Sequence, residues 1–386
     1  MSVASPTAFV AQPLPPWRRA VLKVGSSLLA AAGGGLSTRH ALGLAEFIAA
    51  SHRAGREVVL VSSGAVAAGR AAVRGIGAQA PLAAKQALAA IGQTQMVALW
   101  QRFFDRPVAQ VLLTHDDLRH RRRYLNARAT LRELLQLGAL PVVNENDTVA
   151  VDELKLGDND NLAAIVAALV DADLLLIASD IDGLCTANPR TDPTAQPVPS
   201  VDAITPAVYA MAGGAGSSVG TGGMHTKLQA AAKAAAAGIA TALFNGTRAD
   251  TLRALADGQL HGTRFDPAGT RLAARKYWLR HVPSAGRLWV DAGAARALRG
   301  GRASLLPGGV VGVEGEFSRG DAVEVLLQDE RGPQPVARGL AEYGAAEARR
   351  LAGRHSREIA ELLGYSYGEC LVHRDDLVLL DEEGAT

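Results

Sequence analysis

Two clusters of carboxylate and carboxamide side chains are the part of this sequence best suited to bind a small polar molecule. The first is Asn144-Glu145-Asn146-Asp147, and the second is Gly157-Asp158-Asn159-Asp160-Asn161. Amides both donate and accept hydrogen bonds, so with carboxylates they can hold the ammonium and carboxylate groups of an amino acid. The alternative is that residues 158–161 only cap a helix. A cap needs one such residue, whereas this run supplies four.

The clusters lie between elements that would place them at a sheet edge. The apolar run 139–143 predicts a strand before the first cluster, and the run 162–170 predicts a helix after the second. In an open α/β sheet, ligands bind outside the carboxyl ends of the strands. The position therefore favours a binding site.

Two short loops after predicted strands can seat an anion. Lys23-Val24-Gly25-Ser26-Ser27 combines small residues, whose backbone N–H groups can approach an anion, with one positive charge. Ser62-Ser63-Gly64-Ala65 follows another strand and precedes a helix. On local grounds the second loop fits an N-cap equally well.

A longer glycine-rich loop precedes a third predicted helix. It runs as Gly220-Thr221-Gly222-Gly223-Met224-His225-Thr226-Lys227 and can wrap the phosphates of a nucleotide. It is neither a Walker A motif nor a dinucleotide fingerprint, because the required spacings are absent. The alternative is a loop without function.

Together these loops predict phosphoryl transfer. Two lysines can neutralise the charge that spreads over a transferred phosphoryl group. An acceptor carboxylate, with a solution pKa of about 4.3, needs no general base at pH 7. The chain has only six lysines among its 40 basic residues, and Lys23, Lys155 and Lys227 lie in or beside these motifs. Since arginine does not replace a compact ammonium group, their retention favours a role in function.

The bulk composition is that of an ordinary globular chain. Its 386 residues allow two domains, 48% are hydrophobic, and the net charge is +2. Two cysteines make no disulfide framework or zinc site. The first seventeen residues hold four prolines and no basic start, so we expect a disordered tail over 1–17 rather than a signal peptide. No apolar run is long enough for a membrane span, and a cytoplasmic location is expected.

Alternating strands and helices predict an α/β fold with an open, mostly parallel sheet covered by helices on both faces. The expected strands are 20–24, 58–61, 108–113, 139–143, 174–178 and 241–244; the expected helices are 38–54, 81–104, 124–137, 162–170 and 230–237. After about residue 270, short β-like runs punctuated by Pro307-Gly308-Gly309 and Gly332-Pro333 predict a small β-rich domain. The boundary is expected between Pro267 and Gly286.

The motifs in combination resemble a known family. KVGSS, SSGA, NEND, GDNDN, SDIDGL, NPR and GTGGMHTK occur in this order, as in the glutamate 5-kinases of the amino acid kinase family. SLLPGGVVGVEGEFSRGDAVEV, HSREIAELLGYSYGE and VHRDDL resemble the PUA domain that follows the kinase in many members. The resemblance implies an amino acid kinase domain over 18–267 and a PUA domain over 286–380. Cys185 departs from the pattern, because an aromatic residue is expected there.

The resemblance implies ATP-dependent phosphorylation of the glutamate side-chain carboxylate to γ-glutamyl phosphate, at the start of proline synthesis. Lys23, Lys227 and Asp160 would be catalytic, with Lys23 on the ATP phosphates, Lys227 on the transferred group and Asp160 orienting both. Glutamate would be held by Ser63, Asp147 and Asn159. ATP would be held by Lys23, Ser179, Asp180, Thr221, Gly222, Gly223, Met224, His225, Thr226 and Lys227.

The same resemblance implies further partners. Mg²⁺ would bridge the phosphates, with no side chain assigned to the metal. Proline would inhibit by feedback, and the chain would form a homo-oligomer, a dimer or tetramer. Functional coupling to the γ-glutamyl phosphate reductase is also implied.

Two alternatives remain at this point. Another amino acid kinase, such as an acetylglutamate kinase or aspartokinase, is disfavoured by the paired NEND and GDNDN motifs and by the PUA-like tail. An RNA-binding protein is the second alternative, since residues 271–302 carry eight basic residues against one acid.

Overall fold

The computed structural model describes residues 9–31, 34–73, 80–150, 159–213, 223–270, 279, 283–301, 303–329 and 332–380. The chain divides into two compact units, with the main boundary near residue 271. Each unit is described by itself.

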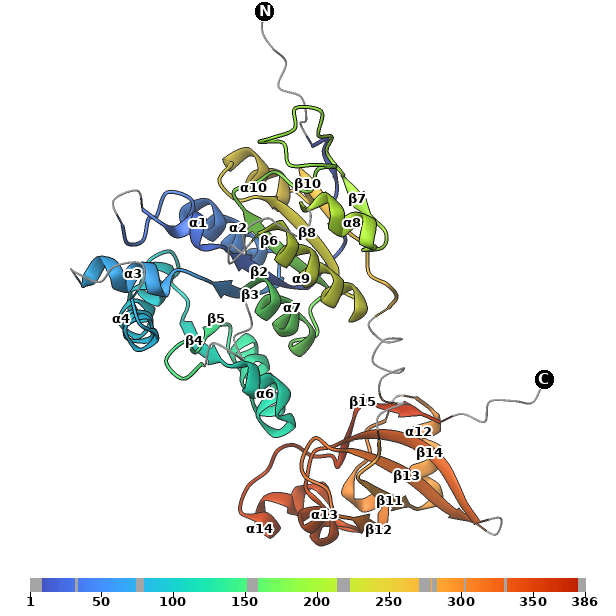
Figure 1. Cartoon of the computed structure of the whole chain (residues 1–386). Helices are drawn as coiled ribbons and strands as arrows, with labels where there is room; N and C mark the ends of the chain where they lie inside the picture. Colours follow the sequence, from blue (N-terminus) through green and yellow to red (C-terminus); the bar gives the residue numbers. More distant parts are fainter. Residues whose placement is uncertain are drawn as a thin grey trace, which may run out of the picture. The chain divides into compact units, whose positions relative to one another are not determined.

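The first unit is built on an eight-stranded sheet (Figure 1). In spatial order the strands are β4 (Val108–Leu113), β5 (Leu140–Glu145), β3 (Glu57–Ser62), β2 (Arg19–Val24), β6 (Leu174–Ser179), β8 (Ala240–Asn245), β10 (Gly262–Phe265) and β7 (Ser200–Val201). Every neighbouring pair is parallel except β8 with β10. The predicted α/β fold with a mostly parallel sheet is therefore confirmed.

Ten helices occur in the described part of this unit. They are α1 (Ser26–Leu29), α2 (Ala41–Arg53), α3 (Ala65–Ala72), α4 (Leu82–Gln101), α5 (His115–Arg119), α6 (Arg121–Gln136), α7 (Asn159–Leu169), α8 (Pro206–Met211), α9 (Met224–Ala236) and α10 (Ala249–Ala256). The central strands β2, β6 and β8 are mainly apolar and almost entirely buried, because helices cover both of their faces.

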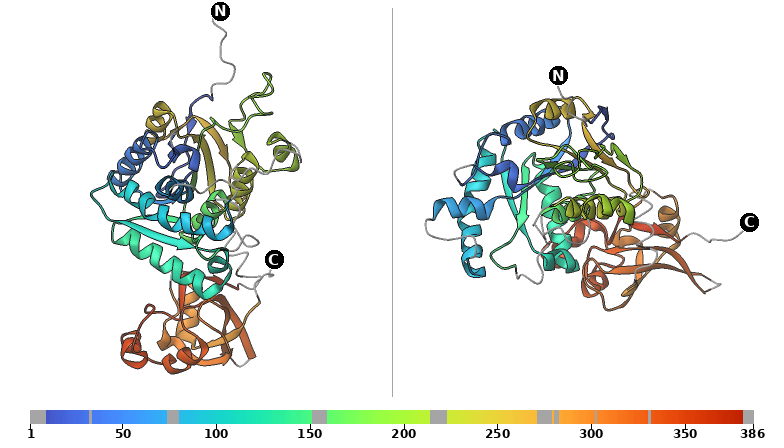
Figure 2. Two further views of the ribbon diagram at one scale, coloured as in Figure 1. Left: turned by 60° about the vertical axis from the view of Figure 1, so that its left-hand side comes forward. Right: turned by 45° about the horizontal axis from the view of Figure 1, so that its top comes forward.

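One face of the sheet carries a large core shared by α2, α4 and α10. Phe47 from α2, Trp100 from α4 and Leu255 from α10 join one cluster with Leu22 of β2 and Leu60 of β3. Successive residues of a strand point to opposite faces, so the neighbours of Leu22 and Leu60 face the other way. There α7 and α9 lie side by side against β6 and its neighbours (Figures 1 and 2).

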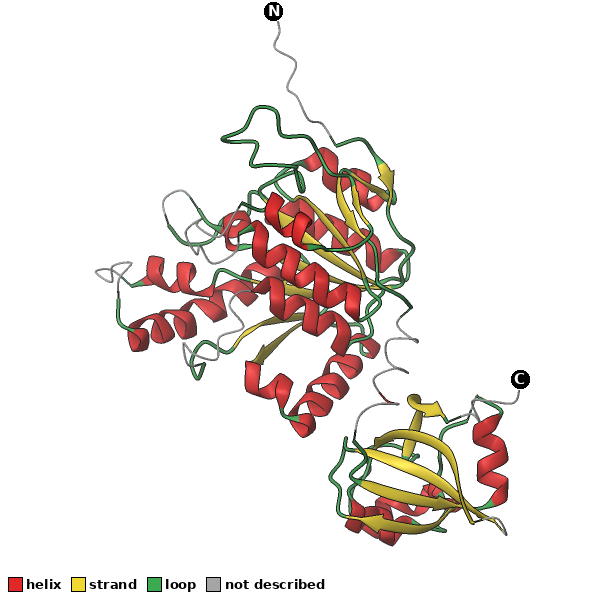
Figure 3. Cartoon of the chain, turned by 45° about the vertical axis from the view of Figure 1, so that its right-hand side comes forward, coloured by secondary structure: helices red, strands yellow, loops and turns green. Residues whose placement is uncertain are grey.

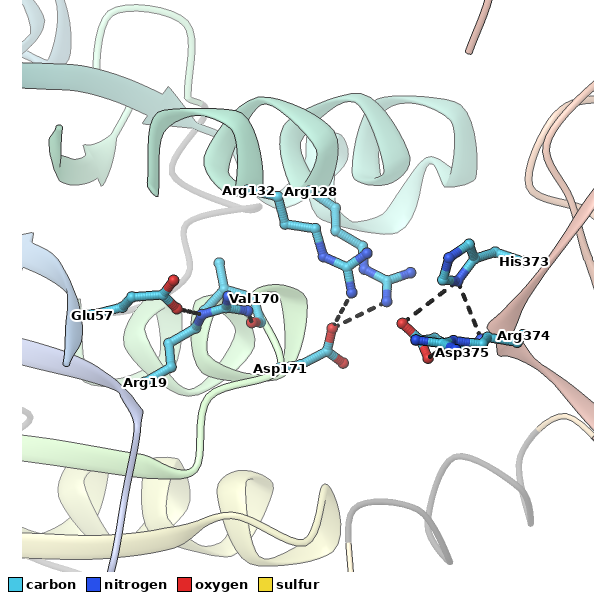
Figure 4. Close-up of polar contacts among 9 residues, drawn as sticks. All are labelled: Arg19, Glu57, Arg128, Arg132, Val170, Asp171, His373, Arg374 and Asp375. Carbon is cyan, nitrogen blue, oxygen red and sulfur yellow. Dashed lines mark hydrogen bonds and ion pairs between the residues drawn. The ribbon is translucent and has the colours of Figure 1, made fainter. Parts of the chain in front are cut away.

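Ion pairs link neighbouring elements at the end of the sheet where β2 and β3 begin (Figure 4). Arg19 at the start of β2 pairs with Glu57 at the start of β3, with Nε and Oε2 2.7 Å apart. Arg19 also donates to the carbonyl of Val170 at the end of α7. The next residue, Asp171, has a φ of 54° and pairs with Arg128 and Arg132 of α6. These contacts hold the C-terminal end of α7 near the starts of β2 and β3. The N-terminal end of α7, which begins at Asn159, lies at the other end of the helix.

The expectation of a disordered tail over 1–17 is wrong for residues 9–17. Strand β1 (Gln12–Pro13) pairs antiparallel with β9 (Gln259–Leu260). Phe9, Leu14 and Trp17 are buried, and Phe9 clusters with Cys185. The prolines suggested a loose chain, but the apolar residues between them bury enough surface to dock it. A two-residue strand also tolerates proline well.

The second unit contains a five-stranded sheet and short helices, coloured by secondary structure in Figure 3. Its strands, in spatial order, are β12 (Val310–Gly315), β11 (Gly286–Val290), β13 (Ala322–Asp329), β14 (Gly332–Ala341) and β15 (Val372–Leu379). Its helices are α12 (Ala292–Arg299), η2 (Pro307–Gly309), α13 (Ala345–Leu351), η3 (Ser356–Glu358) and α14 (Ile359–Leu363). A separate hydrophobic core, which includes Val325 and Tyr343, fills this unit.

Strand β14 departs from the sequence-based expectation. Gly332-Pro333 is expected to separate short β-like runs; β13 does end just before it, at Asp329, but β14 begins at Gly332 and includes Pro333 and Pro335. Both prolines pair with β13, whereas the pairing with β15 starts only at Ala337. The prolines thus lie where β14 has one strand neighbour, which is the position that a missing N–H allows.

In the described part of the chain, no helix combines the length and the apolar character that a bilayer span would require.

Candidate active site at the carboxyl ends of the parallel strands

The sheet topology singles out one place for a ligand. Strand β2 lies between β3 and β6, and the chain builds the β3 side first and the β6 side afterwards. The strand order therefore reverses at β2. In open parallel sheets, such a switch point leaves a crevice outside the carboxyl ends of the strands. Lys23 is the last residue but one of β2 and therefore lies at this switch point.

Three charged side chains meet above β2. Asp160, the second residue of α7, is fully buried, and its Oδ1 lies 2.5 Å from Nζ of Lys23. Its Oδ2 lies 3.2 Å from Nζ of Lys227 in the first turn of α9. Both lysines are buried too. The three residues predicted to be catalytic are therefore brought together.

The two ammonium groups set the charge of this cluster. Burial by itself would raise the pKa of Asp160, but the positive charges of Lys23 and Lys227 outweigh it and hold the pKa below its usual range. A hydrogen bond from the Thr226 hydroxyl to Oδ2, 2.9 Å long, acts in the same direction. The cluster of one carboxylate and two ammonium groups has a net positive charge, as a phosphate-binding site requires.

The start of α9 adds a backbone anion seat. Gly223 precedes this helix, and Met224, His225 and Thr226 form its first turn. The first N–H groups of a helix have no partner within it and attract negative charge. The ring of His225 lies 5.2 Å from that of Tyr209 in α8. Thr221 and Gly222, also predicted to bind ATP, lie outside the described residues.

Ser179 and Asp180 lie on the same side of β2 as α9. Ser179 is the buried last residue of β6, and Asp180 follows it with a half-exposed side chain. The Ser179 hydroxyl points to the Asp180 carboxylate at 3.4 Å, and Arg190 approaches the same carboxylate at 3.8 Å. The residues predicted to hold the nucleotide thus gather on the β6 side.

The residues predicted to hold the amino acid gather on the β3 and β5 side. Asn159, the first residue of α7, donates through Nδ2 to Oγ of Ser63 at 2.8 Å and to Oδ1 of Asn144 at 2.9 Å. Asn144 lies near the end of β5 and donates through Nδ2 to Oε1 of Gln93 at 2.9 Å. Side chains from α4, β5, α7 and the loop after β3 form one chain of hydrogen bonds.

Asp147 lies in the turn that follows β5. This turn is shaped by Asn146, whose carbonyl accepts from the backbone of Val149 at 3.2 Å and of Ala150 at 3.1 Å. The side chain of Asn146 also accepts from the Thr148 hydroxyl at 2.5 Å. Asp147 is partly buried. Lys155, Gly157 and Asp158 lie outside the described residues.

Sequence reasoning missed Gln93 altogether and did not assign a role to Asn144. A signal for Gln93 was present, because a polar residue between Gly92 and Met96 interrupts the apolar face of a long helix. Asn144 was part of the first polar cluster, but nothing in its spacing says that it turns inward. Among the described residues, no group of three or more His, Cys, Asp and Glu side chains is arranged to hold a metal.

Comparison with known proteins supplies independent information. Residues 18–245 match the model of the amino acid kinase family, and residues 286–363 match that of the PUA domain. The chain is 69% identical over 362 residues to a protein named glutamate 5-kinase from Xanthomonas oryzae pv. oryzae, covering 93% of this chain and 100% of the relative. It is 66% identical over 378 residues to glutamate 5-kinase from Xylella fastidiosa, covering 97% and 98%.

A solved structure is also similar to this chain. It is carbamate kinase from Giardia lamblia bound to AMP-PNP, with a TM-score of 0.46 and 18% identity over 68% of this chain and 99% of that chain.

Proposed function

This chain belongs to the amino acid kinase family, and from that premise we propose that it transfers the γ-phosphoryl group of ATP to the side-chain carboxylate of L-glutamate. The observation that carries this proposal is the buried Asp160 with its two lysines, set between an amide-rich half and a nucleotide half. The products would be γ-glutamyl phosphate and ADP.

The reaction asks little acid–base chemistry of the protein. A carboxylate oxygen of glutamate forms a bond to the γ-phosphorus while the bond from that phosphorus to the bridging oxygen of ADP breaks. No proton moves, because the acceptor is ionised at neutral pH. The protein must align the two substrates and stabilise the charge on the transferred group.

Lys23 and Lys227 are proposed to supply that stabilisation. Lys23 would contact the ATP phosphates from the central strand, and Lys227 the transferred group from α9. Asp160 holds the two ammonium groups close together, because one of its oxygens contacts Lys23 and the other contacts Lys227. Without this carboxylate, two like charges would share one buried pocket, which is costly.

The amide chain is proposed to receive the amino acid. Both Nδ2 hydrogens of Asn159 are used by Ser63 and Asn144. Its Oδ1 is therefore the atom left to accept a hydrogen bond, and the Ser63 hydroxyl, which accepts from Asn159, can donate its own proton. Asp147 would pair with the α-ammonium group of glutamate.

The hydrogen-bond donors and positive charges on the β6 side fit the phosphates of ATP. The net positive charge, the start of α9 and Ser179 match phosphate oxygens. Mg²⁺ is usually held through phosphates with one or two carboxylates, and it would neutralise part of the phosphate charge. We propose that it enters with ATP.

We also propose a metabolic setting for this reaction. The product belongs at the start of proline synthesis, and proline, which shares an α-carboxylate and a cationic nitrogen with glutamate, would compete at the amide half. Homo-oligomerisation, coupling to the reductase, a cytoplasmic location and domain limits of 18–267 and 286–380 stay predictions.

A direct test measures ADP release by the purified full-length chain with glutamate, aspartate or N-acetylglutamate. We expect turnover with glutamate only, and proline should raise the glutamate concentration needed for half-maximal rate while changing that for ATP less. Preference for N-acetylglutamate or aspartate would reject the assignment. An unmoved glutamate curve at millimolar proline would reject the feedback proposal alone.

One observation favours RNA binding as a second function. In the second unit, the exposed rings of Tyr365 and Tyr367 lie 5.2 Å apart, and the Arg319 guanidinium lies 4.0 Å from the Tyr367 ring centre. Exposed aromatic rings beside arginine can stack on unpaired bases. Of the eight basic residues in the stretch 271–302 that first indicated RNA binding, five lie outside the described residues.

A further inference from the structure

We propose that Gln93 is a positioning residue for the amino-acid site, which fixes the direction of the hydrogen bonds that Asn144 and Asn159 offer to the substrate. This inference rests on the proposed function. It concerns a helix residue that does not belong to any of the motifs in which the site was recognised.

Gln93 is held in a defined place. It is 6% exposed, and its helix α4 packs on α3 at unusually short range. A Cβ atom added to Gly92 would lie 1.8 Å from the Ala65 carbonyl oxygen, and one added to Gly69 would lie 1.9 Å from that of Leu88. Only glycine fits at these two points. The close contact between the backbones of α3 and α4 therefore fixes the position of Gln93 relative to α3.

A second contact ties the same face of α4 to the site. Trp100 follows Gln93 by seven residues, or two helical turns, and so shares its face. Its indole Nε1 donates to Oγ of Ser62 at 2.9 Å in the buried interior. Ser62 precedes Ser63, the residue that accepts from Asn159. Helix α4 therefore contacts the ends of both β3 and β5.

The hydrogen-bond chain has a direction that begins at Gln93. An asparagine side chain can present either its oxygen or its nitrogen, because the two ends are nearly equal in size. Gln93 presents Oε1, so Asn144 turns its Nδ2 toward α4 and its Oδ1 toward Asn159. Asn159 must then turn its Nδ2 toward Asn144, and its Oδ1 remains to accept a hydrogen bond from the substrate.

Gln93 also has a hydrogen-bond group to spare. Its Nε2 is buried and lacks a hydrogen-bond partner among the residues that the structure describes. A buried amide nitrogen is rarely left so, and a partner is normally supplied by protein, water or ligand.

The test compares Gln93→Met with Gln95→Met, a matched change at an exposed position of the same helix. Wild-type turnover with glutamate is measured first, and its absence would reject the proposed function rather than this inference. With turnover present, we expect Gln93→Met to raise the KM for glutamate by about 5- to 100-fold, the range for a buried amide left without its partner. The KM for ATP should stay within about twofold, and kcat should change less than the glutamate KM.

Two further variants separate positioning from general damage. Gln93→Glu keeps an oxygen for Asn144, so its glutamate KM should rise less than that of Gln93→Met. In an Asn144→Ala background, Gln93→Met should add little, because both changes break the same chain. An unchanged glutamate KM, equal rises in the Glu and Met variants, or additive effects in the double variant would each overturn the proposal. If Gln93→Met does not fold, Gln93→Ala, which removes the same oxygen, takes its place in each of these comparisons.

Discussion

Asp160 is the residue on whose charge the site depends most. It is buried between two ammonium groups, and none of the three is exposed to water. Such a cluster contributes little net stability when intact, because desolvation offsets the attraction. Removal of the carboxylate alone would leave two buried like charges without compensation.

We therefore expect Asp160→Asn to lower the free energy of unfolding by about 3–5 kcal/mol at pH 7, the cost of breaking a buried ion pair. The folded pKa of Asp160 is below the unfolded value of about 3.9. Its stabilisation is thus complete at neutral pH and is lost as the pH falls below about 4, through the folded pKa. Denaturant unfolding from pH 3 to 7 measures both effects. A gap between wild type and variant that does not narrow below pH 4 would contradict this linkage.

Lys227→Ala tests the proposed role in charge stabilisation. If the ammonium group contacts the transferred phosphoryl group most strongly in the transition state, kcat should fall by about 10²- to 10³-fold, as for other electrostatic donors. The KM for glutamate should change much less. Lys85→Ala, at an exposed position of α4, is the control. Turnover of Lys227→Ala within a few-fold of wild type would reject the role.

At the scale of elements, the contact of α3 with α4 governs how precisely the amide chain is placed. A methyl group at Gly92 would meet the Ala65 carbonyl oxygen and, at 2.4 Å, the Gly69 nitrogen. Because these are backbone atoms, the helices must separate. The shift would move Gln93 and Trp100 together.

We expect Gly92→Ala to lower the free energy of unfolding by about 1–3 kcal/mol or more, the usual cost of overpacking, and to raise the KM for glutamate. Gly269→Ala is the matched control, since a Cβ there meets nothing within 4 Å. Thermal unfolding and steady-state kinetics are measured on both variants. If Gly92→Ala and Gly269→Ala had the same stability and the same KM for glutamate, the contact between α3 and α4 would not control the site.

Many of the helices and strands could be predicted from the sequence. The runs 20–24, 108–113 and 174–178 are predicted to be strands because they are short and mainly apolar, and the structure places strands there. A helix is expected after Ser62-Ser63-Gly64-Ala65, and α3 lies there. The close approach of α3 to α4 at Gly69 could not be predicted, because it depends on how the two helices pack. The bond from Asn159 to Ser63 joins residues 96 positions apart, and no local pattern encodes that distance. The family resemblance, not periodicity, supplied the roles proposed for these residues.

At the scale of the molecule, each unit has its own hydrophobic core. All the site residues described above precede residue 228, in the first unit. Backbone contacts of this unit continue to Ala268, whose N–H donates to the Ala235 carbonyl at 3.0 Å. A chain that ends at Thr270 keeps these contacts.

We expect the chain 1–270 to fold and to phosphorylate glutamate with a KM near that of the full chain. The two proteins are compared by circular dichroism, by ADP release and by RNA retention at two salt concentrations. RNA binding, if present, should require the second unit and weaken steeply with salt. A folded but inactive truncated chain would show that the first unit does not suffice. Salt-sensitive RNA binding by full-length protein without kinase activity would favour the RNA-binding alternative.

The pairing of β1 with β9 has a consequence for biosynthesis. Gln12 donates to the carbonyl of Gly262, 250 residues further along, and His261 contacts the carbonyl of Phe9. The first segment of the described chain to leave the ribosome therefore meets its partners only after nearly the whole first unit has been translated. At about 5–20 residues per second, that interval is roughly 12–50 s. Phe9, which packs on Cys185 and Ala195, lacks its buried neighbours for most of this interval, so the nascent chain offers a chaperone an apolar side chain that the folded protein hides.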